Sequence, residues 1–306
     1  MNEVRVLAPA TVANVVCGFD CLGFALAEPN DEMIVRLAEE KTVRIINRDH
    51  YDLPVEPKKN VAGAALLSML EKLDADFGFE VEITKHIKPG SGIGSSAASA
   101  GGAVVAANAL LNDKFSPLEL VDLAMDGEKI ASGERHADNV APCIYGGFTL
   151  VRSLNPLDVV TLEFPPLFVT VIHPQIEIKT SEAREMLPKE VPLKSAIRQW
   201  SNLGALVAAL SKGDYELIAR SLEDFLIEPV RKTLIPKFDE VKAQSKLAGA
   251  LGGGISGSGP SIFMLSETEE SARKVENAMS EIYRETSIEF YTYVSGINTG
   301  GVKFID

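Results

Sequence analysis

The sequence predicts an α+β fold built from two domains. The chain has 306 residues, 46% of them hydrophobic, so it is long enough for two domains and apolar enough to fill their cores. Patterns in the second half follow the order strand, helices, two strands, helix, strand, which is the split βαβ order of ferredoxin-like domains. A proline-bearing stretch at residues 156–166 is the best candidate for the domain crossing. We therefore divide the chain into residues 1–160 and 161–306.

The first half begins with short apolar, β-rich runs, and the turn residues Pro29, Asn30 and Asp31 separate two of them. Apolar residues from Ala62 to Leu73 then recur at the i, i+3, i+4, i+7 spacing of a helix that buries one face. We expect strands at residues 4–9, 22–26, 33–37, 42–47, 79–87 and 146–152, and helices at residues 62–73, 97–111 and from Ser116-Pro117 onward.

The second half supplies the elements behind the split βαβ order. Its helices include an amphipathic segment with apolar residues at Ala272, Val275, Met279 and Ile282. We expect strands at residues 168–173, 248–256, 261–265 and 288–294, and helices at residues 181–245 and around 272–282.

Composition limits the ligands that the protein can bind. The formal net charge is -13, which argues against nucleic acid or an anionic membrane as a partner, because both require a basic face. We find no export signal and no apolar run of the roughly 20 residues that a membrane helix needs, so we expect a cytoplasmic protein. Three cysteines without metal-site spacing indicate thiols and no structural metal. A polyphosphate ligand would need backbone amides, a helix N-terminus and a bound cation.

A glycine-rich loop at residues 89–97 meets that need. Gly90, Gly92 and Gly94 alternate between a predicted strand and a predicted helix, so the backbone can approach a ligand and the helix directs its free N–H groups at it. A flexible turn would not explain this spacing beside Ser95 and Ser96. The loop lacks the lysine of a P-loop, and no strand ending in an acidic residue follows as a dinucleotide fold requires. The loop therefore predicts a phosphate cradle of another kind.

Three segments together resemble the motifs of the GHMP kinase superfamily, which includes galactokinases, homoserine kinases, mevalonate kinases and phosphomevalonate kinases. Residues 9–14 with 18–20 resemble the first motif, residues 89–99 the second and residues 253–261 the third, in the same order along the chain. The resemblance implies an N-terminal domain like ribosomal protein S5 domain 2, followed by a ferredoxin-like domain.

Three further segments, at residues 134–142, 180–184 and 228–231, resemble the homoserine kinase branch of the superfamily. Two positions depart from the motifs. Cys17 stands where the first motif usually has proline, and the proline that often precedes the second motif is shifted to Pro89. Neither position supplies a side chain that the chemistry needs.

The resemblance implies ATP and Mg²⁺ as cofactors. Ser96 and Glu128 match the metal-facing serine and glutamate of the family, and both offer the hard oxygen ligands that Mg²⁺ prefers. Taken alone, Glu128 reads as a solvated helix residue. Asn60 and Val61 match positions of adenine contacts. The ATP-binding residues implied are Asn60, Val61, Pro89, Gly90, Ser91, Gly92, Ile93, Gly94, Ser95, Ser96, Ala97, Ala98 and Ser99.

The implied acceptor is L-homoserine, whose ammonium, carboxylate and hydroxyl need an anion, a bidentate cation and a neutral hydrogen-bonding group. By resemblance, Asn14 and Asp20 bind the amino end, and Arg184 and Arg231 hold the carboxylate. Taken alone, each arginine reads as a surface ion-pair partner. The residues implied at the reacting end are His136, Asp138 and Asn139.

Asn139 falls where several relatives have a catalytic aspartate, and an amide cannot accept a proton at neutral pH. We expect Asn139 to orient the hydroxyl with help from Thr180, beside Asp138, while the proton passes to a phosphate oxygen. The third motif is expected to form a turn against the phosphate loop.

The expected activity is therefore the ATP-dependent phosphorylation of homoserine in threonine biosynthesis. Two alternatives stay open: a mevalonate- or sugar-kinase-like enzyme, and a non-catalytic sensor on the same fold. The partners expected are small molecules, with a homodimer suggested by family habit.

Overall fold

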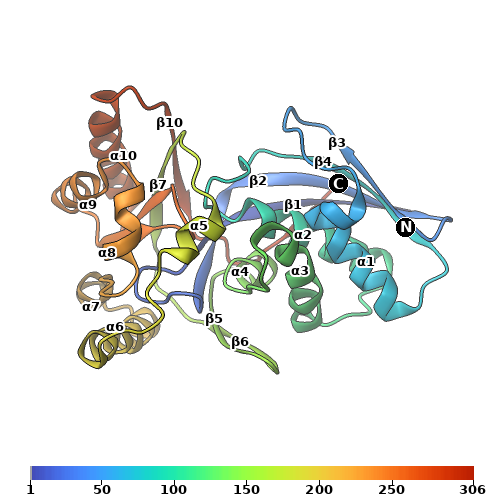
Figure 1. The fold of residues 1–306 in the computed structure, drawn as a ribbon, viewed down its shortest axis with the longest axis horizontal. Coiled ribbons are helices and arrows are strands. Elements are labelled where there is room, and N and C mark those ends of the chain that lie inside the picture. The colour runs from blue at the N-terminus through green and yellow to red at the C-terminus, as the bar shows by residue number, and fades with distance from the viewer. Residues whose placement is uncertain (1) are drawn as a thin grey trace.

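The computed structural model describes residues 2–306 and has two β-sheets. Figure 1 shows the larger sheet with helices α1 to α4 gathered beside it, and the smaller sheet with helices α6 to α10 around it. The short helix α5 lies between the two groups, and both ends of the chain lie on the side of the larger sheet. Within residues 2–306, no helix has both the length and the apolar character needed to cross a membrane.

The larger sheet has seven strands: β1 (Glu3–Ala13), β2 (Leu22–Ala38), β3 (Val43–Asn47), β4 (Gly78–Thr84), β5 (Phe148–Leu154), β6 (Leu157–Leu162) and β11 (Lys303–Ile305). Its order is β11-β1-β2-β4-β3, with β5 paired to both β2 and β6, and only β3 and β4 are parallel. Its helices are α1 (Val61–Leu73), α2 (Ser95–Leu110), α3 (Pro117–Ser132) and α4 (Val140–Tyr145). The short 3₁₀ turn η1 (Pro57–Lys59) precedes α1.

The smaller sheet has the antiparallel order β10-β7-β9-β8, formed by β7 (Phe168–Pro174), β8 (Gly252–Ile255), β9 (Ile262–Ser266) and β10 (Phe290–Gly296). Its helices are α5 (Thr180–Glu185), α6 (Leu193–Lys212), α7 (Tyr215–Ser221), α8 (Glu228–Arg231), α9 (Phe238–Leu247) and α10 (Glu269–Arg284), with the turn η2 (Lys232–Leu234). The chain order and the sheet order are those of a ferredoxin-like domain, so the predicted α+β fold is confirmed.

The predicted turn at Pro29, Asn30 and Asp31 is wrong, because β2 continues through it. The register between β1 and β2 shifts between Pro9 and Thr11, so residues 26–29 face an irregular stretch of the ladder. Pro29 therefore has no ladder hydrogen bond to lose. Pairing with β1 along one edge, and with β4 and β5 along the other, overrides the local turn signal.

Three elements were not expected from the sequence: α4, β6 and β11. Strand β6 lies in the proline-bearing stretch and forms a hairpin with β5. Strand β11 returns to pair with β1 in the larger sheet. The division at residues 160 and 161 stays a prediction.

Aromatic side chains join the two sheets. Phe24 of β2 is fully buried, with its ring centroid 4.7 Å from that of Phe148 on β5 and 5.7 Å from that of Phe263 on β9. One continuous apolar core therefore runs from the larger sheet into the smaller one.

Candidate active site

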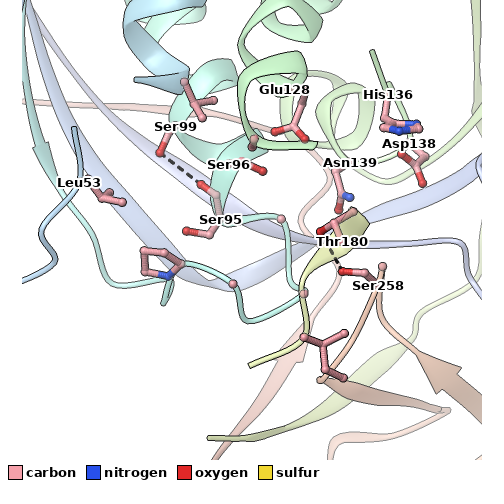
Figure 2. A pocket seen from close by; sticks show the side chains of 18 of the residues that line it. Leu53, Ser95, Ser96, Ser99, Glu128, His136, Asp138, Asn139, Thr180 and Ser258 are labelled. Atoms are coloured by element: carbon pink, nitrogen blue, oxygen red, sulfur yellow. Dashed lines mark hydrogen bonds between the residues drawn. The ribbon is translucent and has the colours of Figure 1, made fainter. Parts of the chain in front are cut away.

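A cavity of about 310 Å³ is lined by residues of both halves of the chain. Figure 2 shows side chains from the start of α2, from α3, from the segment before α4, and from Thr180 and Ser258 arranged around it. Most of the predicted site residues line this cavity: Asn14, Asp20, Asn60, Val61, Pro89, Gly90, Gly92, Gly94, Ser95, Ser96, Ser99, Glu128, His136, Asp138, Asn139, Thr180, Arg184 and Arg231. Four predicted residues do not line the cavity, because their side chains are buried in the loop or in the first turns of α2: Ser91, Ile93, Ala97 and Ala98.

The glycine loop leads directly into α2. Gly90, Gly92 and Gly94 all have positive φ angles, of 74°, 83° and 67°. A Cβ on Gly92 would lie 2.5 Å from the carbonyl oxygen of Gly259, and one on Gly94 would lie 1.9 Å from Oγ1 of Thr11. Glycine is therefore required twice over at these two positions. The positive end of a 16-residue helix faces the cavity, as a phosphate site requires.

The third motif holds this loop from the other side. Ser256 donates its hydroxyl to the carbonyl oxygen of Gly92 at 2.7 Å, and Ser261 donates to that of Ser91 at 2.6 Å. Two carbonyl oxygens that would repel a phosphate thereby accept hydrogen bonds from the segment between β8 and β9.

Lys85 lines the cavity and was not predicted as a site residue. It is buried, forms an ion pair with Asp31, and donates to the Ser95 carbonyl oxygen at 2.7 Å and to Oγ of Ser99 at 2.9 Å. A buried charge needs such partners. Lys85 thus fixes the first turn of α2 from beneath.

Ser96 and Glu128 meet across two helices, as Figure 2 shows. Glu128 is buried on α3, and its carboxylate is hydrogen-bonded to Ser96. Burial raises the pKa of Glu128 above its usual value. Among residues 2–306, no group of three or more His, Cys, Asp or Glu side chains is placed to hold a metal ion. A metal held here would depend on oxygen ligands from a bound phosphate.

Arg184 sits among acidic groups at one end of the cavity. Its Nη2 donates to both oxygens of Asp20, at 2.9 and 3.1 Å, and lies 3.3 Å from Nε2 of His136. Its Nη1 lies 3.7 Å from a carboxylate oxygen of Glu134, which was not among the predicted site residues. Burial lowers the pKa of His136, so the ring favours its neutral form.

Arg231 lies beside Arg184, and both guanidinium groups contact the ring of Phe19, at 5.1 and 5.6 Å from its centroid. Arg231 is buried and donates to the carbonyl oxygens of Ala183 and Gly257, each at 3.2 Å. Burial lowers its pKa from the usual value. The two arginines thus bring two cationic forks to one place, which suits a carboxylate ligand.

Asn14 holds the turn that carries Asp20. Its amide donates to the carbonyl oxygen of Gly257 at 2.7 Å and accepts the Asp20 N–H at 3.0 Å. Asn14 and Asp20 both have positive φ, as do Val15 and Val16 between them, and a β-branched residue there is strained. Such strain is typical of a functional turn.

Both halves of the chain match domains of one family. The GHMP kinases N terminal domain matches residues 60–147, and the GHMP kinases C terminal domain matches residues 206–285. A homoserine kinase of Chlorobium phaeobacteroides is 46% identical, with 100% of both chains covered. A homoserine kinase of Chloroherpeton thalassium is 47% identical, with 94% of each chain covered. The crystal structure of homoserine kinase from Cytophaga hutchinsonii has a TM-score of 0.95 and 49% identity, covering 100% of this chain and 98% of that one.

The chain belongs to the homoserine kinases of the GHMP kinase family. The resemblance carried by the three motifs is confirmed by these matches. Asn139, which was predicted at the reacting end, lines the cavity, and its Oδ1 accepts the Thr11 hydroxyl at 2.8 Å. Thr180 and Ser258 also line the cavity, and the distance between Thr180 Oγ1 and Ser258 Oγ is 3.2 Å.

Sequence reasoning missed several residues around this site, among them Lys85, which lines the cavity, and Thr11 and Glu134, which contact predicted site residues. Thr11 lies inside the first motif and Glu134 inside a segment typical of homoserine kinases, so their positions carried a signal. Lys85 carried none, because its partner Asp31 is 54 residues away in sequence.

Asp138 is a predicted site residue whose burial makes the stability of the fold depend on pH. It is buried, and burial together with the neighbouring Asp20 and Glu128 carboxylates raises its pKa from the usual 3.8 to about 7. Below the lower value the carboxyl is protonated in both the folded and the unfolded chain. Above the higher value it is ionised in both, and the folded state bears the full cost.

Asp138→Asn should therefore gain stability relative to wild type as pH rises from about 4 to about 7, by about 4 kcal/mol at most. The measurement is the free energy of unfolding in denaturant at several pH values, with the exposed Asp113→Asn as the control. A difference between Asp138→Asn and wild type that does not change over this range would contradict the raised pKa.

Proposed function

We propose that this chain transfers the γ-phosphoryl group of ATP to the side-chain hydroxyl of L-homoserine, producing O-phospho-L-homoserine for threonine biosynthesis. The observation that carries the proposal is one cavity with a phosphate cradle at one end and a zwitterion pocket at the other. The full-length likeness to homoserine kinases supports the same activity.

ATP binds with its phosphates on residues 90–97 and its base toward the start of α1. Asn60 is the N-cap of α1: its side chain accepts the Gly63 N–H at 3.2 Å and donates to the Pro54 carbonyl at 2.7 Å. These bonds fix the loop that meets Val61 at the cavity wall. An adenine ring fits against this ordered, largely apolar edge.

Ser96 and Glu128 would hold a magnesium ion beside the bound phosphates. Their hydroxyl and carboxylate oxygens are hard ligands, and Mg²⁺ is usually held by one or two protein groups plus phosphate oxygens and water. When bound, the ion neutralises charge that develops on the transferred phosphoryl group. The buried Glu128 then keeps its negative charge, because a cation offsets the cost of its burial.

Homoserine binds at the other end through its opposite charges. Arg184 and Arg231 hold its carboxylate, while Asp20, placed by Asn14, holds its ammonium. The substrate thus replaces part of the Asp20–Arg184 ion pair with matched charges of its own. His136, neutral because its pKa is lowered, packs beside them without adding a charge.

The acceptor hydroxyl reacts without a dedicated protein base. Asn139 orients it, Thr180 assists from the opposite wall, and the proton passes to a phosphate oxygen, which a loose transition state permits. Asp138, next to Asn139 in the cavity wall, contributes to the electrostatic field at the acceptor hydroxyl. We also propose that the protein is cytoplasmic and forms a homodimer.

The acceptor is tested by coupled ADP release with ATP, Mg²⁺ and homoserine, mevalonate or galactose in separate reactions. Homoserine should support turnover at least about 100-fold faster than the other two at low concentration, because only homoserine satisfies both charged groups. Faster turnover with mevalonate or galactose would favour the other kinase class, and none with any acceptor would favour a sensor.

Arg184→Ala should raise KM for homoserine on the order of 100-fold, because it removes one of the two cations proposed to hold the substrate carboxylate. KM for ATP should change by less than about threefold. Steady-state kinetics with each substrate varied in turn makes the comparison, with Arg220→Ala on the exposed face of α7 as the control. Equal increases in both KM values would refute the carboxylate clamp.

The absence of a base is tested by the pH dependence of kcat in wild type and Asp138→Asn. The two profiles should have the same shape around neutral pH, since no carboxylate has to lose its proton for transfer. The proposal fails if wild-type kcat decreases as the pH drops below a single pKa near 7 and this decrease is missing in Asp138→Asn.

A further inference from the structure

We infer that Thr11 is a positioning residue for phosphoryl transfer, which holds Asn139 in register with the phosphate loop. This inference rests on the proposed function, because it assigns Thr11 a part in the same reaction. Thr11 does not line the cavity, so it acts through Asn139 and not on the substrate.

Thr11 contacts both halves of the reacting centre. It lies on β1 and is fully buried. Its backbone N–H donates to the carbonyl oxygen of Ile93, inside the glycine loop, at 3.1 Å. Its hydroxyl donates to Oδ1 of Asn139, the N-cap of α4, at 2.8 Å. A single rigid residue therefore joins the donor side of the cavity to the acceptor side.

Gly94 makes this joint tight. A Cβ on Gly94 would lie 1.9 Å from Thr11 Oγ1 and 3.1 Å from Asn139 Oδ1. The last glycine of the loop, the threonine hydroxyl and the asparagine amide are thus in mutual contact, with no room for another atom. Because the three residues are in contact, a shift of one displaces the other two. The contact therefore couples three different parts of the chain.

The hydrogen bond also decides which end of the amide meets the substrate. Oδ1 of Asn139 is engaged by Thr11, so Nδ2 is the end left for the cavity. An amide nitrogen is a donor only. It can hold the acceptor oxygen through a lone pair while leaving the hydroxyl proton directed at the phosphate. In this arrangement Thr11 holds Asn139 in place with its Oδ1 turned away from the nucleophile.

Positioning of this kind is where phosphoryl transfer gains its rate, since donor and acceptor must be held in line. A displacement of about 1 Å can cost on the order of 100-fold in rate. The loss of the Thr11 hydroxyl should therefore appear in kcat, while the groups that bind ATP and homoserine remain in place.

Thr11→Val tests the inference, because valine keeps the size and β-branching of threonine but removes the hydroxyl. We expect kcat to fall by about 10- to 100-fold while both KM values stay within about threefold. Thr11→Ser, which keeps the hydroxyl, should recover most of kcat. Equal losses in Thr11→Val and Thr11→Ser, or a change confined to KM, would overturn it.

A double-mutant cycle with Asn139→Ala separates positioning from general damage. If Thr11 acts through Asn139, adding Thr11→Val to Asn139→Ala should lower kcat by no more than about twofold further. Independent, multiplying losses would show that Thr11 acts by another route and would overturn the inference.

A spectroscopic readout keeps this test apart from that of the proposed function. The side-chain amide pair of Asn139 can be assigned in a ¹⁵N–¹H spectrum by its loss in Asn139→Ala. It should shift in Thr11→Val and keep its position in Thr11→Ser, whatever the acceptor turns out to be. An Asn139 signal that does not move in Thr11→Val would overturn the inference, whereas wild type without homoserine turnover would overturn only the proposed function.

Discussion

The site depends on holding a polyanion in a protein of net charge -13. The solution is local: the N-terminus of α2 faces the cavity, and Lys85 is buried beneath its first turn. The acidic groups Asp20, Glu128 and Asp138 line the same cavity, so the attraction cannot come from the overall field. Backbone amides and a helix dipole supply positive potential without the conformational freedom of long basic side chains. Everything else in the cavity is placed relative to that helix end.

The cavity also requires that the two sheets stay joined. The third motif grips the glycine loop through Ser256 and Ser261, and Gly92 leaves no space between the loop and Gly259. Arg231 comes from the smaller sheet's side, yet it stacks on Phe19 from the first motif. Neither half alone could form the phosphate loop in this shape and the zwitterion pocket together. The shared aromatic core around Phe24 therefore serves the site as well as the fold.

Local patterns predicted the parts of the molecule whose cause is local. Ser116 caps α3 and Pro117 begins it, as expected, and the split βαβ order predicted the smaller sheet. Pairing between distant segments was beyond such patterns. Strand β2 runs through Pro29 because its neighbours order it, and Lys85 is a site residue because Asp31 lies opposite. The glycine loop and the first motif, which contains Thr11, were visible in sequence, but the contact between Thr11 and Asn139 was not, because it arises only in the fold.

The choice of acceptor depends on the Asp20–Arg184 ion pair, which a bound substrate would have to separate. Asp20 and Arg184 satisfy each other, with Glu134 on the outer side of the guanidinium. Both side chains of this pair are about one-third exposed, and a substrate that separates them and covers them from water must supply each with a new partner. In the proposed binding mode, homoserine brings an ammonium for Asp20 and a carboxylate for the arginines, so both charges are matched again. A hydroxy acid without an ammonium would leave Asp20 unmatched, and a neutral sugar would leave both. In this proposal the discrimination comes less from shape than from the cost of leaving a charge without a partner once the bound acceptor covers it.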